Sequence, residues 1–243
     1  MIDLNLVMER LPEFFGARDG QPMLGTADGL MMTLQLLFIS LLLGLAMAVP
    51  LALLRVSRNR VASGAVWLFG YLFRGTPLLV QLFIVYYGLA QFGWIRDSWA
   101  WQYLQEAYVC AIVAFTLNTA AYTTEIIAGQ IRNTHWGEIE AARAMGMSHG
   151  LLLRRIVLPS ALRRALPAYS NEVIMMLQST AIAGLVTLAD LTGVARRIYS
   201  ESYMPFEPFL TAAAIYLALT FGLVWLMKRA ERRYLAYLSP RSH

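Results

Sequence analysis

Three charged side chains lie within the long apolar stretches of this sequence. They are Arg74, Glu125 and Glu172. A charge inside a bilayer is costly, so such a residue faces an opposite charge or a polar cavity. One interpretation is an internal ion-pair network, in which one or both carboxylates neutralise Arg74. The other is a binding site with two carboxylates and one arginine, whose excess negative charge suits a zwitterion that carries an additional cation.

Uncharged polar residues accompany these charges along the chain. The N–H groups of residues 76–78 are free where a new helix is predicted to begin, so they or Arg74 can meet a ligand carboxylate. Hydrogen bonding between helices is an alternative role for each polar side chain taken singly. The candidate substrate-binding residues are Arg74, Thr76, Asn118, Tyr122, Glu125, Glu172, Ser179 and Thr180.

Other kinds of chemical site find little support in the sequence. Cys110 is the only cysteine and lies in an apolar run, which argues against a disulfide framework or a thiolate metal site. His135, His149 and His243 lie outside the apolar runs, so no haem is held between spans. A membrane enzyme is therefore disfavoured, and we expect no catalytic or metal-binding residue. The GxxxxGK[ST] phosphate-binding sequence is absent, so the chain cannot power pumping with ATP on its own.

The elements that position these residues are long apolar segments. With 58% hydrophobic and 14% charged residues, the composition is typical of a membrane protein. About 20 apolar residues allow a helix to cross a bilayer. We predict an all-α integral membrane protein with five transmembrane helices, at residues 31–54, 65–92, 107–131, 166–188 and 208–227. The second is interrupted by Arg-Gly-Thr-Pro at residues 74–77, where Thr76 is predicted to cap a new helix and Pro77 to begin it.

Lysine and arginine residues are distributed unevenly between the two sides of the predicted membrane. Fourteen lie on one side, namely Arg55, Arg58, Arg60, Arg132, Arg143, Arg154, Arg155, Arg163, Arg164, Lys228, Arg229, Arg232, Arg233 and Arg241. Five lie on the other, namely Arg10, Arg18, Arg96, Arg196 and Arg197. The richer side is predicted to be cytoplasmic. The net charge of +5 then reflects membrane topology, and no nucleic acid partner is expected.

This topology divides the chain into three parts. Residues 1–26 form a predicted periplasmic segment, which carries Asp3, Glu9, Glu13 and Asp19 and lacks the pattern of a cleavable signal. Residues 27–234 form the transmembrane domain, with a cytoplasmic loop at 132–165. Residues 235–243 form a cytoplasmic tail.

The loop at residues 137–159 is predicted to form two short helices joined by a turn. Glu138 lies in the first turn of the first helix, where the helix dipole favours negative charge. Gly146 suits the left-handed position that ends this helix, and Ser148 can cap the next one. Pro159 is expected to end or bend the second helix. An ordered loop of this kind between membrane spans indicates a docking surface.

The residues of this loop resemble a known family signature. Glu140, Ala141, Ala142, Gly146, Ile156, Leu158 and Pro159 match the EAA–G–I-LP signature of ABC-importer membrane subunits. In that family the loop is the coupling helix, which fits into a cleft of an ATPase subunit. The resemblance therefore implies an ATPase-coupling role for Gly137, Glu138, Glu140, Ala141, Ala142, Gly146, Ile156, Leu158 and Pro159.

The resemblance extends through most of the chain. The segments at residues 73–82, 117–126, 158–181 and 228–233 resemble the polar amino-acid branch of ABC permeases, most of all M-type subunits of histidine/lysine/arginine/ornithine and opine permeases. This implies a type I ABC importer permease fold in the bacterial inner membrane, and alternating access as the mechanism. The implied partners are a second, similar permease subunit, two ATPase subunits that use ATP and Mg, and a periplasmic amino-acid-binding protein. No cofactor is expected on this chain itself.

Two further classes of transport protein remain as alternatives. An ion-driven secondary transporter also uses intramembrane carboxylates and broken helices. The absence of an internal repeat and the presence of a docking loop argue against it, and dependence of uptake on ATP or on an ion gradient discriminates the two. A channel would need no docking loop, and conductance recordings would identify one.

Overall fold

The computed structural model describes residues 4–16 and 28–235, which are mainly helical and contain no named β-strand. The α-helices are α1 (Leu4–Phe14), α2 (Gly29–Arg55), α3 (Arg60–Gly75), α4 (Leu78–Phe83), α5 (Gly93–Arg96), α6 (Trp101–Leu104), α7 (Ala107–Arg132), α8 (Trp136–Ala144), α9 (His149–Leu152), α10 (Leu158–Ser179), α11 (Leu191–Ser202) and α12 (Phe206–Tyr234). Short π-helical turns, η1 (Ile84–Gly88) and η3 (Leu153–Val157), and 3-10 turns, η2 (Leu89–Gln91) and η4 (Thr180–Val186), extend several of them.

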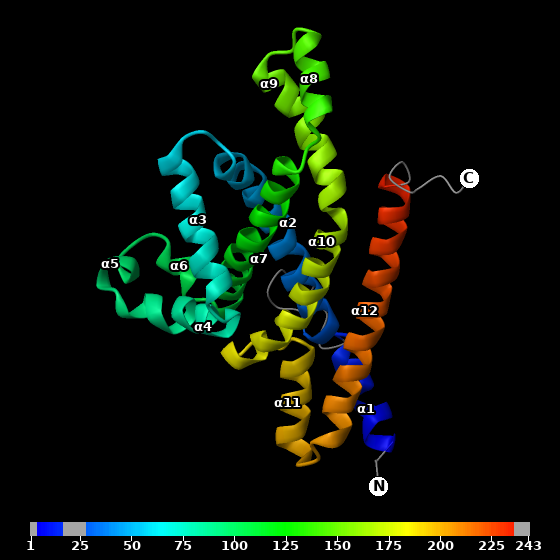
Figure 1. The fold of residues 1–243 in the computed structure, drawn as a ribbon. Coiled ribbons are helices and arrows are strands. Elements are labelled where there is room, and N and C mark those ends of the chain that lie inside the picture. Colours follow the sequence, from blue (N-terminus) through cyan, green and yellow to red (C-terminus); the bar gives the residue numbers. More distant parts are fainter. Residues whose placement is uncertain (1–3, 17–27, 236–243) are drawn as a thin grey trace, which may run out of the picture.

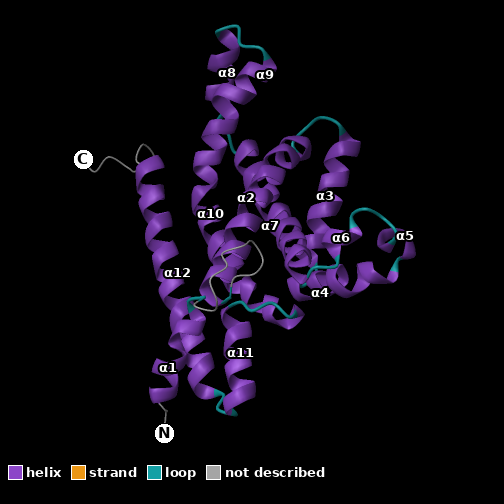
Figure 2. Ribbon diagram, turned by 180° about the vertical axis from the view of Figure 1, so that it is seen from behind, coloured by secondary structure: helices purple, strands orange, loops and turns teal. Residues whose placement is uncertain are grey.

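The long helices form a bundle with a protruding end. In Figures 1 and 2, α2, α7 and α10 lie side by side in the centre, α3 flanks α7, and α12 packs on α10. The helices α8 and α9 project from one end beyond the rest of the bundle (Figure 1). The largest apolar core lies between α2, α7, α10 and η4, and includes Leu36, Phe115 and Leu177.

Four of the five expected spans correspond to helices of sufficient length and apolarity. They are α2, α7, α12 and a pair formed by α3 and the segment Leu78–Gln91, which is bent by 102°. The expected span at 166–188 differs, because α10 begins at Leu158 and ends at Ser179, after which the chain continues as η4. With α10 as the fifth member, the structure is consistent with the predicted five-helix membrane protein.

Small residues allow α2 and α7 to pack closely. Gly44, Ala48 and Ala52 recur at every fourth position of α2, and therefore lie on one face of that helix. A Cβ atom on Gly44 would overlap the methyl group of Thr119 on α7. Close approach of this kind is how helices associate in membranes, where lipid is as apolar as the side chains. The seam holds together the two helices around which the others are arranged.

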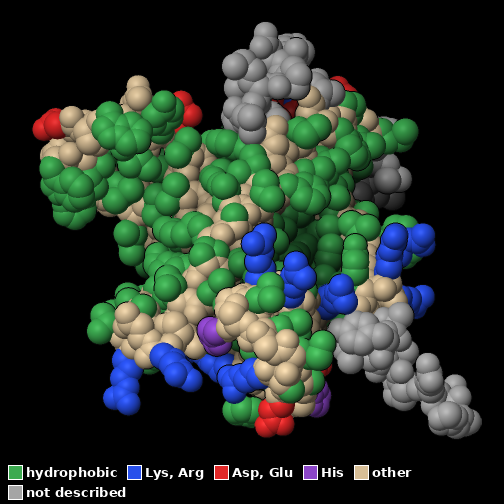
Figure 3. All heavy atoms as spheres, turned by 90° about the horizontal axis from the view of Figure 1, so that it is seen from above, with side chains coloured by type: hydrophobic (Ala, Val, Ile, Leu, Met, Phe, Trp, Pro, Cys, Tyr) green, Lys and Arg blue, Asp and Glu red, His purple; other side chains and the backbone are tan. Residues whose placement is uncertain are grey.

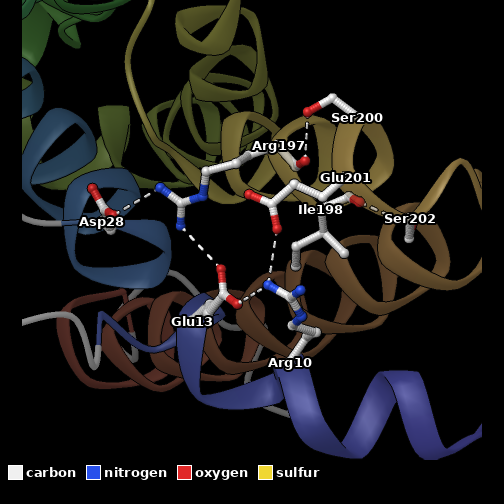
Figure 4. A network of polar contacts seen from close by, with 8 residues as sticks. All are labelled: Arg10, Glu13, Asp28, Arg197, Ile198, Ser200, Glu201 and Ser202. Carbon is white, nitrogen blue, oxygen red and sulfur yellow. Dashed lines mark hydrogen bonds and ion pairs between the residues drawn. The ribbon is translucent and has the colours of Figure 1, made fainter.

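The N-terminal helix α1 was not predicted from the sequence. It packs against α11, α12 and the start of α2, and two of the four ion pairs drawn in Figure 4 join it to α11. Arg197 on α11 binds Glu13 at 3.3 Å and Asp28 at 3.1 Å. Arg10 on α1 binds Glu13 at 2.9 Å and Glu201 at 3.0 Å. This network, Glu201–Arg10–Glu13–Arg197–Asp28, fastens α1 to the end of the bundle opposite α8 and α9.

Candidate functional site

A cavity of about 370 Å³ lies beside the break between α3 and α4. Three elements line it, namely the break itself, α7 and α10. Its lining residues are Arg74, Gly75, Thr76, Pro77, Leu78, Asn118, Tyr122, Glu172, Met175, Met176 and Ser179. Six of the eight predicted substrate-binding residues therefore border one cavity, although they are far apart in the sequence.

Two buried amide side chains stabilise the helix break. The Gln81 side chain donates to the carbonyl of Phe73 at 2.7 Å and to the carbonyl of Thr76 at 2.9 Å. Asn118 on α7 donates to the same Phe73 carbonyl at 3.2 Å and to Gln81 Oε1 at 3.1 Å. A helix that stops inside a membrane leaves carbonyl groups without partners, and these amides satisfy them. Asn118 thus has a structural role, as the alternative interpretation proposed, and Gln81 is a polar residue of the apolar run that sequence reasoning overlooked.

The predicted capping at the break is wrong in its details. Thr76 does not cap the following helix, because its hydroxyl donates backwards to the carbonyl of Leu72 at 2.8 Å. Pro77 is the N-cap of α4 and not its first residue. Its carbonyl accepts from Val80 and Gln81 at 3.0 and 3.2 Å. The fixed φ of proline suits either position, so local sequence does not distinguish them.

Two opposite charges remain at the cavity. The Arg74 side chain is exposed, and its Nε donates to the carbonyl of Gly70 at 3.2 Å. Glu172 is only 6% exposed, and no cation of the described chain lies within 4.0 Å of its carboxylate. The ion-pair network of Arg74 with one or both glutamates, which was one of the two interpretations, is therefore not formed among the described residues. A buried carboxylate without a cationic partner beside a cavity is a candidate for binding a ligand cation.

Glu125 and Thr180 lie outside this cavity. The Glu125 carboxylate accepts from Arg55 Nε at 2.7 Å, and Arg132 is 4.0 Å away. Arg55 also donates to Ser63 at 3.2 Å, so this pair joins the adjoining ends of α2 and α3 to α7. Thr180 is fully buried and donates to the carbonyl of Leu177 at 2.6 Å. The expected excess of two carboxylates over one arginine is thus reduced to one charge of each sign.

The helix pair α8–α9 forms an elbow with its own small core. We use the word elbow for residues 136–157. Ala142, Leu152 and Val157 are buried there, with Ile139 and Ile156 packed around them. Gly146 has a φ of +75°, as predicted, and its N–H donates to the carbonyl of Arg143 at 2.9 Å. Ile156 and Ala142 of the family signature therefore stabilise the elbow, and do not lie on its outer surface.

The outer surface of the elbow carries large apolar side chains that sequence reasoning missed. Trp136 is 70% exposed and Met145 is 81% exposed. Gly137, Glu138, Glu140 and Ala141 are also exposed. Apolar side chains of this size on a protruding tip indicate an interaction surface. Trp136 and Met145 flank the signature residues in the sequence. This position next to the signature is the signal by which Trp136 and Met145 could have been identified.

Two expectations about the second half of the elbow are corrected. Ser148 is the N-cap of α9, but its side chain makes no capping hydrogen bond. Pro159 neither ends nor bends a helix, because it lies in the first turn of α10, where its missing N–H is not required. The π-helical turn η3 precedes it and keeps the chain helical from α9 into α10. Leu158 and Pro159 therefore begin the helix that leads from the elbow to the cavity.

Arg164 fastens the start of α10 to the end of α7. Its guanidinium donates to Ser160 at 2.6 Å, to the carbonyl of Gln130 at 3.1 Å and to Thr134 at 3.0 Å. The two stems of the elbow are thus linked at its base. The two helices linked in this way, α7 and α10, carry Asn118 and Glu172 respectively.

Residues 12–236 match a family described as binding-protein-dependent transport system inner membrane component. The chain belongs to this family. The permease is 46% identical over 231 residues to the nopaline transport system permease protein NocM of Agrobacterium fabrum, covering 95% of this chain and 91% of that protein. It is 47% identical over 215 residues to the histidine/lysine/arginine/ornithine transport system permease protein HisM of Escherichia coli, covering 88% and 90%. The predicted membership of the ABC-importer permeases is confirmed.

Structural comparison agrees with the sequence relationship. A solved structure described as an amino acid ABC transporter with histidines matches 96% of this permease and 99% of its own chain, with a TM-score of 0.81 and 33% identity. The predicted type I permease fold is therefore confirmed. The relatives are transport subunits and not enzymes, and the family description places the permease in the inner membrane.

Proposed function

We propose that this permease carries basic amino acids or opines through the inner membrane, in an importer driven by separate ATPase subunits. The names of its relatives support this substrate class, since they transport nopaline or histidine, lysine, arginine and ornithine. The observation that carries the proposal is the cavity, where the buried Glu172 carboxylate and Arg74 border one space. A substrate with both a cationic and an anionic group complements these two charges.

The roles of the cavity residues follow from their contacts. Glu172 receives the cationic group of the substrate, and Arg74 receives its carboxylate, for which a guanidinium is well suited. Gln81 and Asn118 hold the helix break in place. Thr76, Tyr122 and Ser179 offer hydroxyl groups at the cavity wall, although each already donates to a backbone carbonyl, at 2.8, 3.4 and 2.8 Å respectively. Glu125 and Thr180 contribute to the scaffold.

The elbow at residues 136–157 is the proposed contact with the ATPase. Two ATPase subunits, a second permease subunit of similar fold and a periplasmic amino-acid-binding protein complete the transporter, and ATP with Mg binds to the ATPases. The elbow and the C-terminal end of α12 face the cytoplasm in this arrangement, and α1 faces the periplasm. Closure of the ATPase pair moves the elbow, and the Arg164 contacts transmit this movement to α7 and α10. The cavity then opens alternately to each side.

A cysteine cross-linking experiment tests the docking and the orientation together. Cys110 is the only cysteine and is buried, so the background of labelling is low. We expect Met145→Cys to cross-link to an ATPase subunit and to react with impermeant reagents from the cytoplasmic side only. Val61→Cys is a matched control, since Val61 is 82% exposed at the start of α3. Labelling of Met145→Cys from the periplasm, or the absence of any ATPase cross-link, would contradict the proposal.

Uptake by the reconstituted complex tests the energy source. We expect accumulation of arginine in proteoliposomes to require ATP and the binding protein, and to persist when ionophores collapse ion gradients. Uptake that follows an ion gradient without ATP would instead support a secondary transporter.

A further inference from the structure

Four cationic side chains surround a cavity at the C-terminal end of α12. The cavity has a volume of about 450 Å³ and is lined by Trp225, Lys228, Arg229, Arg232 and Arg233. With 3.6 residues per turn, all four cations fall within about 80° of Trp225 around the helix. Figure 3 shows Lys and Arg side chains gathered on this end of the molecule. The end of α12 is thus a compact cationic site.

These cations have no acidic partner within the described chain. No ion pair or hydrogen bond of residues 4–16 and 28–235 involves the side chains of Lys228, Arg232 or Arg233. Arg229 contacts the Trp225 ring, with its guanidinium carbon 5.9 Å from the ring centroid. Glu231, the nearest carboxylate in the sequence, points away and accepts from Ser170 on α10 at 2.7 Å. The positive charge is therefore available to an external anion.

An exposed apolar stripe leads directly to this cationic site. Leu217, Phe221 and Trp225 follow one another at every fourth position, which places them on one face of α12. They are 56%, 65% and 64% exposed. Arg229 continues the same series. A molecule that covered the whole face would need an apolar part along α12 and an anionic part at its end.

We propose that this face binds an anionic phospholipid, with the headgroup phosphate against Arg229 and Arg232 and an acyl chain along Leu217 and Phe221. Charge complementarity and the continuity of the apolar stripe with the cations select this occupant over a soluble anion. Clusters of basic residues next to a membrane helix attract anionic lipids, and the indole of Trp225 suits the interface between the two parts. The proposal depends on the location of the permease in a bilayer and is independent of its substrate.

Native mass spectrometry of the assembled transporter tests this site. The complex is titrated with phosphatidylglycerol or with phosphatidylcholine of the same acyl chains, and with glycerol 3-phosphate as a headgroup without chains. We expect phosphatidylglycerol to bind more tightly than phosphatidylcholine, and glycerol 3-phosphate not to compete. The variant Arg229→Gln/Arg232→Gln should weaken phosphatidylglycerol binding roughly tenfold or more. The control Arg58→Gln/Arg60→Gln removes two exposed cations, one from the loop between α2 and α3 and one from the start of α3, and should leave this binding unchanged.

A photoreactive benzoylphenylalanine in place of Phe221 identifies the occupant in native membranes. Capture of phospholipid supports the proposal, whereas capture of a second permease subunit or an ATPase overturns it. Equal affinity for the two lipids, or full binding in the Arg229→Gln/Arg232→Gln variant, also overturns it. Competition by glycerol 3-phosphate would show a soluble phosphate site in its place.

Discussion

At the scale of single residues, the structure separates charges that the sequence presents as one group. Arg74, Glu125 and Glu172 all interrupt apolar runs, but only Arg74 and Glu172 border the cavity. Glu125 is held by Arg55 from the end of α2. The two glutamates therefore have different roles, although their sequence contexts are alike, and isosteric substitutions can distinguish them.

Glu172→Gln should impair recognition of a cationic substrate. The change removes one charge–charge contact, so we expect the KM for arginine uptake to rise about tenfold, which corresponds to about 1.4 kcal/mol. The thermal stability of the complex should not fall, because the substitution removes a buried charge that has no cationic partner in the described structure. Uptake assays in proteoliposomes, beside thermal unfolding of the purified complex, measure both effects. An unchanged KM would exclude Glu172 from substrate binding.

Glu125→Gln should have the opposite pattern. It leaves the partly buried Arg55 guanidinium without its carboxylate, at a cost of about 2 kcal/mol. We expect a lower unfolding midpoint and an unchanged KM for arginine. A raised KM for arginine with normal stability would show that Glu125 takes part in substrate binding.

At the scale of elements, two local arrangements shape the molecule, namely the turn of the elbow and the seam between α2 and α7. Both depend on glycine, for different reasons. Gly146 has a left-handed backbone conformation with open space around it, whereas Gly44 has ordinary helical geometry but no room for a side chain. A substitution at Gly146 therefore tests backbone strain, and a substitution at Gly44 tests steric overlap.

Gly146→Val should distort the elbow. A β-branched residue is disfavoured at a φ of +75°, by about 1–2 kcal/mol, and nothing within 4 Å would obstruct its side chain. We expect reduced ATP-driven uptake and weaker cross-linking of Met145→Cys to the ATPase. Gly146→Asn is the control, since asparagine tolerates this conformation. Equal activity of the two variants would show that the turn can change without consequence.

Gly44→Ala should destabilise the whole bundle. The added Cβ overlaps the Thr119 methyl group, and overpacking of this kind costs about 1–3 kcal/mol. The control Gly64→Ala, in α3 with nothing within 4 Å, should be neutral or stabilising by about 0.5–1 kcal/mol. Unfolding midpoints of the purified complex measure both. A stable Gly44→Ala variant would mean that α2 and α7 can separate without loss.

At the scale of the whole molecule, the ends of the bundle are held in different ways. The elbow end is held by Arg164 and by the Arg55–Glu125 pair. The opposite end is held by the network Glu201–Arg10–Glu13–Arg197–Asp28, which joins α1, the start of α2 and α11 (Figure 4). These contacts join segments that are up to 191 residues apart in the sequence.

Arg197→Gln should release α1 from the bundle. Arg197 contacts both Glu13 and Asp28, and glutamine removes the charge from both ion pairs. We expect faster hydrogen exchange in residues 4–14 and little change in α7 or α10. Arg196→Gln is the control, since Arg196 makes one long contact, with the carbonyl of Gly184 at 3.4 Å. Equal exchange in both variants would assign the docking of α1 to its apolar contacts.

The docking of α1 should also depend on pH. Burial opposes ionisation of Glu13, but Arg10 and Arg197 outweigh it and lower its pKa below the ordinary value of 4.5. Because the pKa of Glu13 is lower in the folded state than in the unfolded state, its ionisation stabilises the folded state at pH values above the ordinary pKa. This stabilisation is lost as the pH falls through the lowered pKa of the folded state. We expect the protection factors of residues 4–14, which correct for the intrinsic pH dependence of amide exchange, to fall below about pH 4, and less so in Glu13→Gln. Exchange with the same pH dependence in both proteins would exclude this carboxylate as the cause.

The sequence alone determined the membrane class, the approximate spans, the break at residues 74–77 and the elbow. These properties are local, because apolar run length, a proline after a charge and a glycine between two short helices act within a few residues. All eight candidate residues were named because polar groups are rare in apolar runs, and six of them border the cavity.

Tertiary structure decided which of these residues meet. Glu125 is paired with Arg55 because α2 and α7 pack closely through Gly44, and no pattern within one helix reveals the partner of a charge on another. The same applies to α1, which is held by contacts far along the chain, and to Trp136 and Met145, whose exposure depends on the small core behind them. Local signals identify the elements and the polar residues, and packing determines their partners.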